Sequence, residues 1–203
     1  MPKTASLFDM RQFVVKEHVG LLKLHDVYDI IDPETQEVVA LARENVSGFK
    51  KFLRLFINKQ LMSTTVEVTE GDETGPLVLR IHRGFALFRP KVYVEDARGN
   101  RLGYFKSKLF SLGGGFWVHD MRDAQVAEVK GDWKGWNFKF LSPGGAEMGV
   151  VTKKWGGVAK ELFTSADTYM VSLEEKAAGD GTAATLLLAA ALAIDIVFKE
   201  TGK

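Results

Sequence analysis

The chain has 203 residues, 46% of them hydrophobic, and its 27 Lys and Arg against 26 Asp and Glu give a net charge of +1. This balance excludes the strong positive field of a nucleic-acid-binding protein, so we expect no nucleic-acid partner and place any affinity for anions in local clusters. The absence of cysteine excludes disulfides, thiolate metal sites and cysteine nucleophiles. Because the first residues carry no apolar run of signal-peptide length, we expect a cytoplasmic protein, with one domain over residues 1–203.

Short runs rich in β-branched and aromatic residues, separated by Gly, Asp, Asn and Pro, predict strands from about residue 12 to 173. Sheets of many strands with apolar inner faces normally curl or close, and closure removes exposed edges. We therefore predict a mainly β fold, a closed twelve-stranded antiparallel barrel. The twelve runs are 12–17, 27–31, 37–42, 62–68, 77–82, 91–96, 101–106, 116–120, 125–130, 136–141, 147–153 and 168–173.

Four connections repeat one pattern, in which an apolar strand ends at Asp or Ser, a polar turn follows, and a small residue lies near the start of the next strand. An Asp or Ser that opens a turn can accept a hydrogen bond from the backbone two residues later. Gly103, Ala127 and Gly149 occupy equivalent places after three of these turns. There they would let the barrel wall approach an enclosed helix. The four units begin at Ile30, Val94, Val118 and Phe140.

Two basic clusters are candidate sites for anions. Residues 48–61 predict a helix with an apolar, aromatic stripe beside Lys50, Lys51, Arg54 and Lys59. Such a helix suits the surface of an anionic membrane, where each basic residue contributes about 1 kcal/mol, or it packs its stripe on the barrel end. The second cluster surrounds the bulky turn 84–88 and could receive a phosphate headgroup, or it is a solvated strand face. It consists of Arg80, His82, Arg83, Arg89 and Lys91.

The four histidines, His18, His25, His82 and His119, are scattered, and none lies at metal-ligand spacing from another. His82 and His119 alternate with apolar residues, so we expect them to be strand residues that face outward or have their polar groups satisfied, and not catalysts. No other catalytic motif is present in the sequence. We therefore expect neither catalytic residues nor a bound metal, and we interpret the protein as a non-enzyme.

Residues 182–198 form a nearly continuous apolar run, TAATLLLAAALAIDIVF, interrupted by Asp195. A helix over about residues 182–199 would have no polar face, so it is either enclosed in a core or spans a membrane. The 17 residues of the run would be about 25 Å long, whereas a membrane span needs roughly 20 apolar residues. The shorter length favours the enclosed core. Asp195 then lies at an exposed helix end, or is a buried charge with a partner. The residues that we assign to this core helix include Leu186, Leu187, Leu188, Leu192, Ile194, Asp195 and Phe198.

From Met148 onward the sequence MGVVTKKWGGVAKELFTSADTYMVSL, with the ending LAIDIVFKE, resembles the phospholipid scramblase and LURP-one-related family. The specific resemblance covers about the last quarter of the chain. It implies a fold shared with Tubby C-terminal domains, a twelve-stranded barrel around a hydrophobic C-terminal helix. The residues that carry it include Gly149, Lys153, Trp155, Phe163 and Asp167.

The resemblance also implies a calcium-binding acidic segment, and here the sequence departs from the family pattern. Asp167 is kept and Glu174 lies nearby, but Ser165 and Lys176 stand where the first and last acids would be. Since calcium takes 6 to 8 oxygen ligands, Asp167 and Glu174 make a poor site and we expect no cofactor.

We expect a cytoplasmic protein that associates peripherally with anionic phospholipid. The alternatives are a scramblase-like lipid transporter whose final helix spans the bilayer, and a soluble scaffold that binds a protein or a small ligand.

Overall fold

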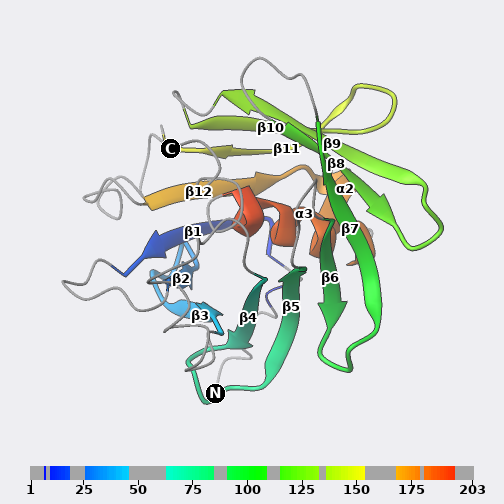
Figure 1. Ribbon diagram of the computed structural model, residues 1–203. Coiled ribbons are helices and arrows are strands. Elements are labelled where there is room, and N and C mark those ends of the chain that lie inside the picture. Colours follow the sequence, from blue (N-terminus) through cyan, green and yellow to red (C-terminus); the bar gives the residue numbers. More distant parts are fainter. Residues whose placement is uncertain are drawn as a thin grey trace.

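The computed structural model describes residues 7, 10–18, 26–45, 63–84, 91–108, 115–132, 136–153, 168–178 and 181–194. Within these ranges twelve strands form one closed antiparallel barrel (Figure 1), so the predicted fold class is confirmed. The strands are β1 (Gln12–Glu17), β2 (Val27–Ile31), β3 (Val38–Glu44), β4 (Thr64–Glu70), β5 (Leu77–Arg83), β6 (Val92–Asp96), β7 (Arg101–Ser107), β8 (Gly115–Asp120), β9 (Gln125–Asp132), β10 (Asn137–Leu141), β11 (Glu147–Thr152) and β12 (Thr168–Leu173).

Each strand pairs with the strand before it and the strand after it, and β1 pairs with β12 to close the barrel. The closing pair joins Gln12 to Ser172, which also share a side-chain hydrogen bond of 3.4 Å. Because every described strand has two neighbours, the barrel leaves no described edge open for pairing with another chain.

The predicted hairpins are present at one end of the barrel, and their turns use the expected hydrogen bond. Asp32, Asp96 and Asp120 each accept, through Oδ1, the backbone N–H two residues later, at 2.8–2.9 Å. In the last unit Ser142 Oγ accepts instead from the N–H of Ala146 at 3.1 Å. The β4–β5 connection, which we did not group with these units, forms a fifth hairpin built on Asp72. The chemistry of each turn therefore sets the register of the strands it joins.

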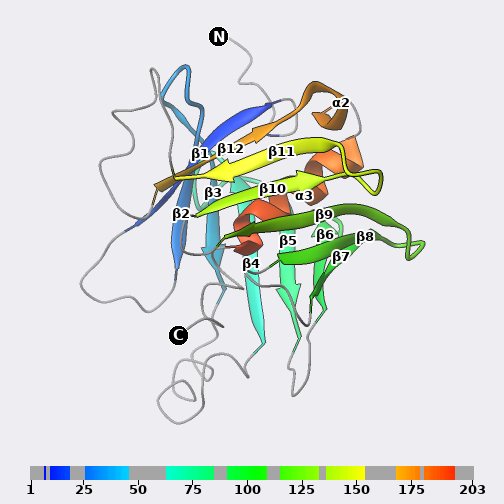
Figure 2. The ribbon, with the colours of Figure 1, turned by 90° about the horizontal axis from the view of Figure 1, so that it is seen from above.

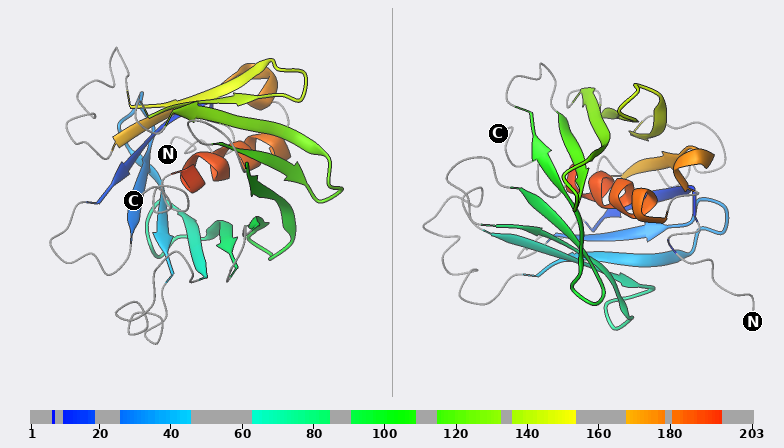
Figure 3. Two further views of the ribbon diagram at one scale, coloured as in Figure 1. Left: turned by 45° about the horizontal axis from the view of Figure 1, so that its top comes forward. Right: turned by 90° about the vertical axis from the view of Figure 1, so that its right-hand side faces the viewer.

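The apolar run near the C-terminus forms the helix α3 (Gly181–Ala193), which lies inside the barrel (Figure 3). The shorter helix α2 (Glu175–Ala178) precedes it at the barrel end where β12 finishes (Figure 2). Every described side chain from Ala184 to Ile194 is buried, including Leu186, Leu187, Leu188 and Leu192. Asp195 and Phe198 lie outside the described residues, so the two interpretations of Asp195 both stand.

The barrel wall is lined by the inward residues of alternating strands, which form one apolar cluster with α3. Gly103 brings the wall close to the helix, because a Cβ there would lie 2.9 Å from Cδ2 of Leu186. Gly149 has another role, since a Cβ there would meet the backbone of β12 and the side chains of Leu173 and Phe140. The expectation that small residues let the wall approach the helix is thus confirmed at Gly103, whereas Gly149 lets neighbouring strands pack together.

Candidate functional site

Four rings from neighbouring strands form a row on the outer wall of the barrel. The pairing register places His82 of β5 opposite Tyr93 of β6, Tyr93 opposite Tyr104 of β7, and Tyr104 opposite His119 of β8. Their strand neighbours Val92, Val94, Phe105 and Val118 belong to the inner apolar cluster, so alternation turns the four rings outward. Both histidines therefore face outward, as expected from their spacing.

Tyr104 is the centre of this row and has contacts on every side. The ring of His119 stacks on it, with centroids 4.9 Å apart and planes 5° apart, and Nζ of Lys91 lies 3.8 Å from the Tyr104 centroid. The hydroxyl of Tyr104 donates a hydrogen bond to Oδ1 of Asp123 in the β8–β9 turn. The side chain is 6% exposed although it points away from the core, because these neighbours cover it.

The electrostatics of the pair follow from these contacts. Desolvation by burial, followed by the hydrogen bond to Asp123, raises the pKa of Tyr104 to about 12. The same hydrogen bond lowers the pKa of Asp123, and electrostatic interactions with Lys91, His119 and Lys106 lower it further. Tyr104 therefore stays neutral and Asp123 stays ionised over the physiological range.

Basic side chains surround the row. Arg101 places its guanidinium 4.3 Å from the ring centroid of Tyr93, and Lys106 is exposed without a hydrogen bond or ion pair among the described residues. We call this surface the aromatic–basic face, and it consists of His82, Lys91, Tyr93, Arg101, Tyr104, Lys106 and His119. The strands β5 to β8 that carry it lie side by side in Figure 1.

A second row, of alternating charge, lies next to the rings on the same wall. Arg80 donates to Glu67 from Nε at 3.2 Å and from Nη2 at 2.9 Å, and its Nη1 lies 3.8 Å from Glu95. Glu95 is also 3.7 Å from Nε of Arg101. Arg80 thus has its charge balanced by two carboxylates, each less than one third exposed.

The structure separates the members of the second basic cluster predicted from the sequence. Lys91 joins the aromatic–basic face, whereas Arg80 belongs to the charged row. Arg83 is 2% exposed, follows Leu79 and Ile81 on the inward side of β5, and donates from Nη2 to Oγ1 of Thr64 at 3.0 Å. In this conformation Arg83 offers no charge to an external ligand. Arg89 lies outside the described residues, as do Lys50, Lys51, Arg54 and Lys59 of the predicted basic helix.

The family motif residues that the structure describes have structural contacts. Nζ of Lys153 lies 4.4 Å from the ring centroid of Trp136, and Gly149 packs against β12. Trp155, Phe163 and Asp167 lie outside the described residues. Of the two calcium candidates, the described one, Glu174, is exposed. No group of three His, Asp or Glu side chains that could hold a metal ion occurs within the described ranges.

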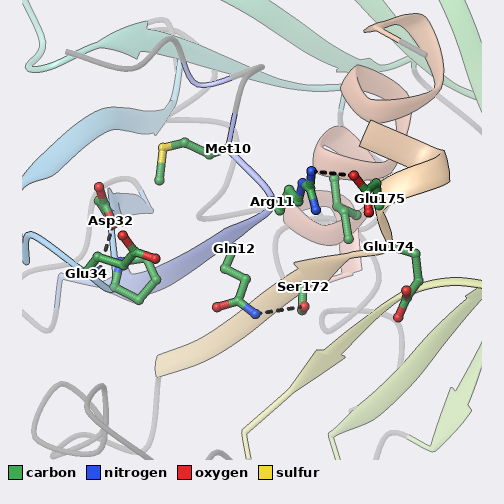
Figure 4. A pocket seen from close by; sticks show the side chains of 10 residues that line it. Met10, Arg11, Gln12, Asp32, Glu34, Ser172, Glu174 and Glu175 are labelled. Atoms are coloured by element: carbon green, nitrogen blue, oxygen red, sulfur yellow. Dashed lines mark hydrogen bonds and ion pairs between the residues drawn. The ribbon is translucent and has the colours of Figure 1, made fainter. Parts of the chain in front are cut away.

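An acidic groove opens at the end of the barrel where β1 begins and β12 ends, with a volume of about 650 Å³. Figure 4 marks three contacts among the residues that line it. Arg11 pairs with Glu175 at 3.1 Å and Gln12 bonds Ser172, while Oδ1 of Asp32 accepts the backbone N–H of Glu34. The groove therefore presents mainly carboxylates, and its charge does not suit an anionic lipid.

Sequence reasoning missed Tyr93, Arg101, Tyr104, Lys106 and Asp123. Part of the signal was present, because the short turn after Asp96 sets Tyr93 and Tyr104 opposite each other once the hairpin is assumed. Asp123 gave a second signal, since it has φ 66° at the turn position where Gly99 and Gly145 lie in sister hairpins.

The protein is thus a closed antiparallel β-barrel that encloses an apolar helix and carries an aromatic and basic outer face. The sequence matches the family model described as Scramblase over residues 25–201, so the chain belongs to the Scramblase family. The resemblance drawn from the last quarter of the chain is thereby confirmed, and it extends over most of the sequence. No curated protein matches the chain. No solved structure matches it either.

None of the helices in the described part of the chain is long and apolar enough to cross a membrane. The longest, α3, has 13 residues, about 20 Å, against the roughly 20 residues that a span needs.

Proposed function

We propose that this chain is a non-enzymatic module that associates peripherally with membranes from the cytoplasm and binds anionic phospholipid through the aromatic–basic face. The observation that carries the proposal is the gathering of Lys91, Arg101 and Lys106 around the rings of Tyr93 and Tyr104. Tyrosine suits the boundary between water and lipid, and lysine and arginine suit anionic headgroups. Membership of the Scramblase family supports lipid as the partner.

Co-sedimentation with vesicles tests the proposal. The parent protein should bind vesicles of phosphatidylserine and phosphatidylcholine and should bind phosphatidylcholine alone much less. Replacing Lys91 and Lys106 together by Gln should weaken binding by about 2 kcal/mol, or about thirtyfold, since each basic residue contributes about 1 kcal/mol. The matched control replaces Lys16 and Lys139 by Gln, which removes the same charge from β1 and β10.

The outcomes test separately whether the protein binds anionic vesicles and whether the aromatic–basic face is the binding site. A parent protein that ignores anionic vesicles would contradict the proposed function. Equal losses in the two double variants would remove the aromatic–basic face as the site and leave only general electrostatic attraction. The variant K50E/K51E/R54E examines the predicted basic helix separately, because a greater loss there would assign the main contact to residues 48–61.

Calcium is not required for the proposed binding, because Ser165 and Lys176 replace acids of the implied calcium segment. Vesicle binding in excess EGTA should equal binding in calcium. A strong calcium dependence would show that Asp167 and Glu174 contribute to a working site.

The second candidate function is transport of lipid between bilayer leaflets, which the family description favours. It would require α3 to leave a barrel in which its side chains are buried from Ala184 onward. Reconstitution into vesicles that carry labelled lipid separates the two functions, because a peripheral module binds the outer leaflet without moving label to the inner one.

A further inference from the structure

The turn that carries Asp123 differs from the β6–β7 and β10–β11 hairpins in the residue at one backbone position, and the β2–β3 hairpin has Gln36 in left-handed backbone at φ 61°. At that position Gly99 and Gly145 adopt φ 82° and 84°, and Asp123 adopts φ 66°. Left-handed backbone favours glycine, although Asp tolerates it better than most residues. The turn does not need this carboxylate for its own geometry, because Asp120 already accepts the backbone N–H groups of Arg122 and Ala124 at 2.9 Å.

The side chain of Asp123 is used instead by the aromatic–basic face. Its Oδ1 accepts the hydroxyl of Tyr104, and Lys91, His119 and Lys106 act on its charge. The backbone carbonyl of Asp123 also lies 3.3 Å from Nδ1 of His119. One carboxylate thus stands among one hydroxyl donor and three groups that are positive or can become so.

The other acids around the cluster are engaged elsewhere. Asp120 holds the turn backbone, and Glu95 lies against Arg80 and Arg101. The single negative charge of Asp123 therefore does not neutralise all the positive charge of the cluster. A phosphate has more acceptor oxygens than a carboxylate, so it could accept from the Tyr104 hydroxyl and also from the surrounding basic side chains.

The geometry also allows an exchange of anions. Asp123 is exposed on the turn, so rotation of its side chain moves the carboxylate into water. The ring of Tyr104 is held between His119 and Lys91, so its hydroxyl stays in place when the carboxylate leaves. The hydroxyl donor is therefore held in place, whereas the carboxylate acceptor can move.

We propose that Asp123 is a built-in counter-anion that occupies a phosphate seat formed by Tyr104, Lys91, Lys106 and His119, and that a lipid headgroup phosphate binds by displacing its carboxylate. This inference rests on the proposed function. It specifies that the bound group is a phosphate and that the Asp123 carboxylate competes with it. The seat accounts for the presence of a carboxylate where two sister turns have glycine.

Vesicle titration of Asp123→Asn and Asp123→Gly tests the inference, since Asn tolerates the left-handed backbone and Gly favours it. Both variants should bind phosphatidylserine–phosphatidylcholine vesicles about fivefold more tightly than the parent, the value of one charge near such a surface. There are two matched controls in the β2–β3 turn. Gln36→Gly places glycine at a residue that also has left-handed backbone, at φ 61°, and Glu34→Gln removes one negative charge. Neither control should tighten binding.

The Tyr104→Phe background separates a seat from general electrostatics. If phosphate takes the place of the carboxylate, the gain from Asp123→Asn should largely disappear in Y104F, because the hydroxyl donor is missing. A gain that persists in Y104F, or no gain in either Asp123 variant while the parent binds vesicles, would overturn the inference and leave the proposed function intact. Absence of vesicle binding in the parent and in both Asp123 variants would overturn the proposed function and the inference with it.

Inorganic phosphate distinguishes a free anion from a headgroup. In D123N it should shift the NMR resonances of Tyr104 and His119 and weaken vesicle binding by competition. Vesicle binding of D123N that phosphate does not reduce, with no shift at either ring, would contradict a phosphate seat.

Discussion

Tyr104 and Asp123 each favour one ionic state of the other. Burial and the hydrogen bond keep Tyr104 protonated up to a pKa of about 12, while the donated hydroxyl holds the pKa of Asp123 below its usual value. Because both groups lie in one hydrogen bond, its contribution to stability changes at both ends of the pH scale.

We expect the parent to lose stability more steeply than Tyr104→Phe as pH rises from about 10 to about 12, because the unfolded state releases the tyrosine proton at lower pH. The contribution of Asp123 should be fully present above its ordinary pKa of 3.8 and be lost as pH falls below that value. Urea unfolding midpoints of both proteins across these ranges measure the effect. Parallel curves would show that the hydrogen bond does not contribute to stability.

Gly103 fixes how close the wall comes to the enclosed helix. A methyl group there would lie 2.3 Å from the carbonyl oxygen of His119 and 2.9 Å from Leu186, so Gly103→Ala should destabilise the fold by about 1–3 kcal/mol. Gly144→Ala is the control, since the nearest atom to its added methyl group is Ser142 Oγ at 3.9 Å. Chemical denaturation measures the difference, and equal stability of the two variants would contradict the close approach.

The hairpins were predictable from the sequence because the residues that form each turn's hydrogen bond lie within the turn itself. An Asp such as Asp32 or Asp96 accepts a backbone N–H two residues later, so the relevant contact is local. The inward position of Arg83 was also available from the alternation of Leu79 and Ile81, and we instead grouped Arg83 with its basic neighbours. The contacts of Tyr104 were not available, because they join three separate segments through side-chain rotamers.

The charged row across β4, β5 and β6 should stabilise the sheet and contribute little to lipid binding. Arg80→Ala leaves Glu67 and Glu95 without the cation between them, so we expect a loss of about 1–2 kcal/mol in unfolding free energy. Arg98→Ala, in the exposed β6–β7 turn, should cost much less. Vesicle binding of folded R80A should equal that of the parent, and a selective loss of binding would return Arg80 to the lipid site.

At the scale of the whole molecule, the fold follows from one apolar helix that must be covered on all sides. A sequence with no polar face over residues 186–194 predicts enclosure, and the strand count supplies the enclosing wall. The acidic groove could not be predicted, because its residues come together from the start of β1, the β2–β3 turn and the end of β12 only after the barrel closes.

The closed wall makes a prediction for native-state hydrogen exchange. Amides from Ala184 to Ala193 should exchange only when the whole barrel opens, so their protection should equal the global unfolding free energy. Adding anionic vesicles should leave this protection unchanged in a peripheral module. Faster exchange of the helix in the presence of vesicles, with the strands still protected, would indicate that α3 leaves the barrel and would favour the transporter function.

Closure of the barrel by β1 and β12 has a consequence for biosynthesis. Gln12 and Ser172 are 160 positions apart, and the segment that fills the lumen follows both of them in the chain. During translation, the apolar strands therefore emerge from the ribosome before the helix that fills the barrel has been made. Slow, non-local pairing of this kind favours aggregation. We infer that the newborn polypeptide needs chaperone protection until its last segment emerges, and that a premature stop before Gly181 yields insoluble material instead of a smaller working protein.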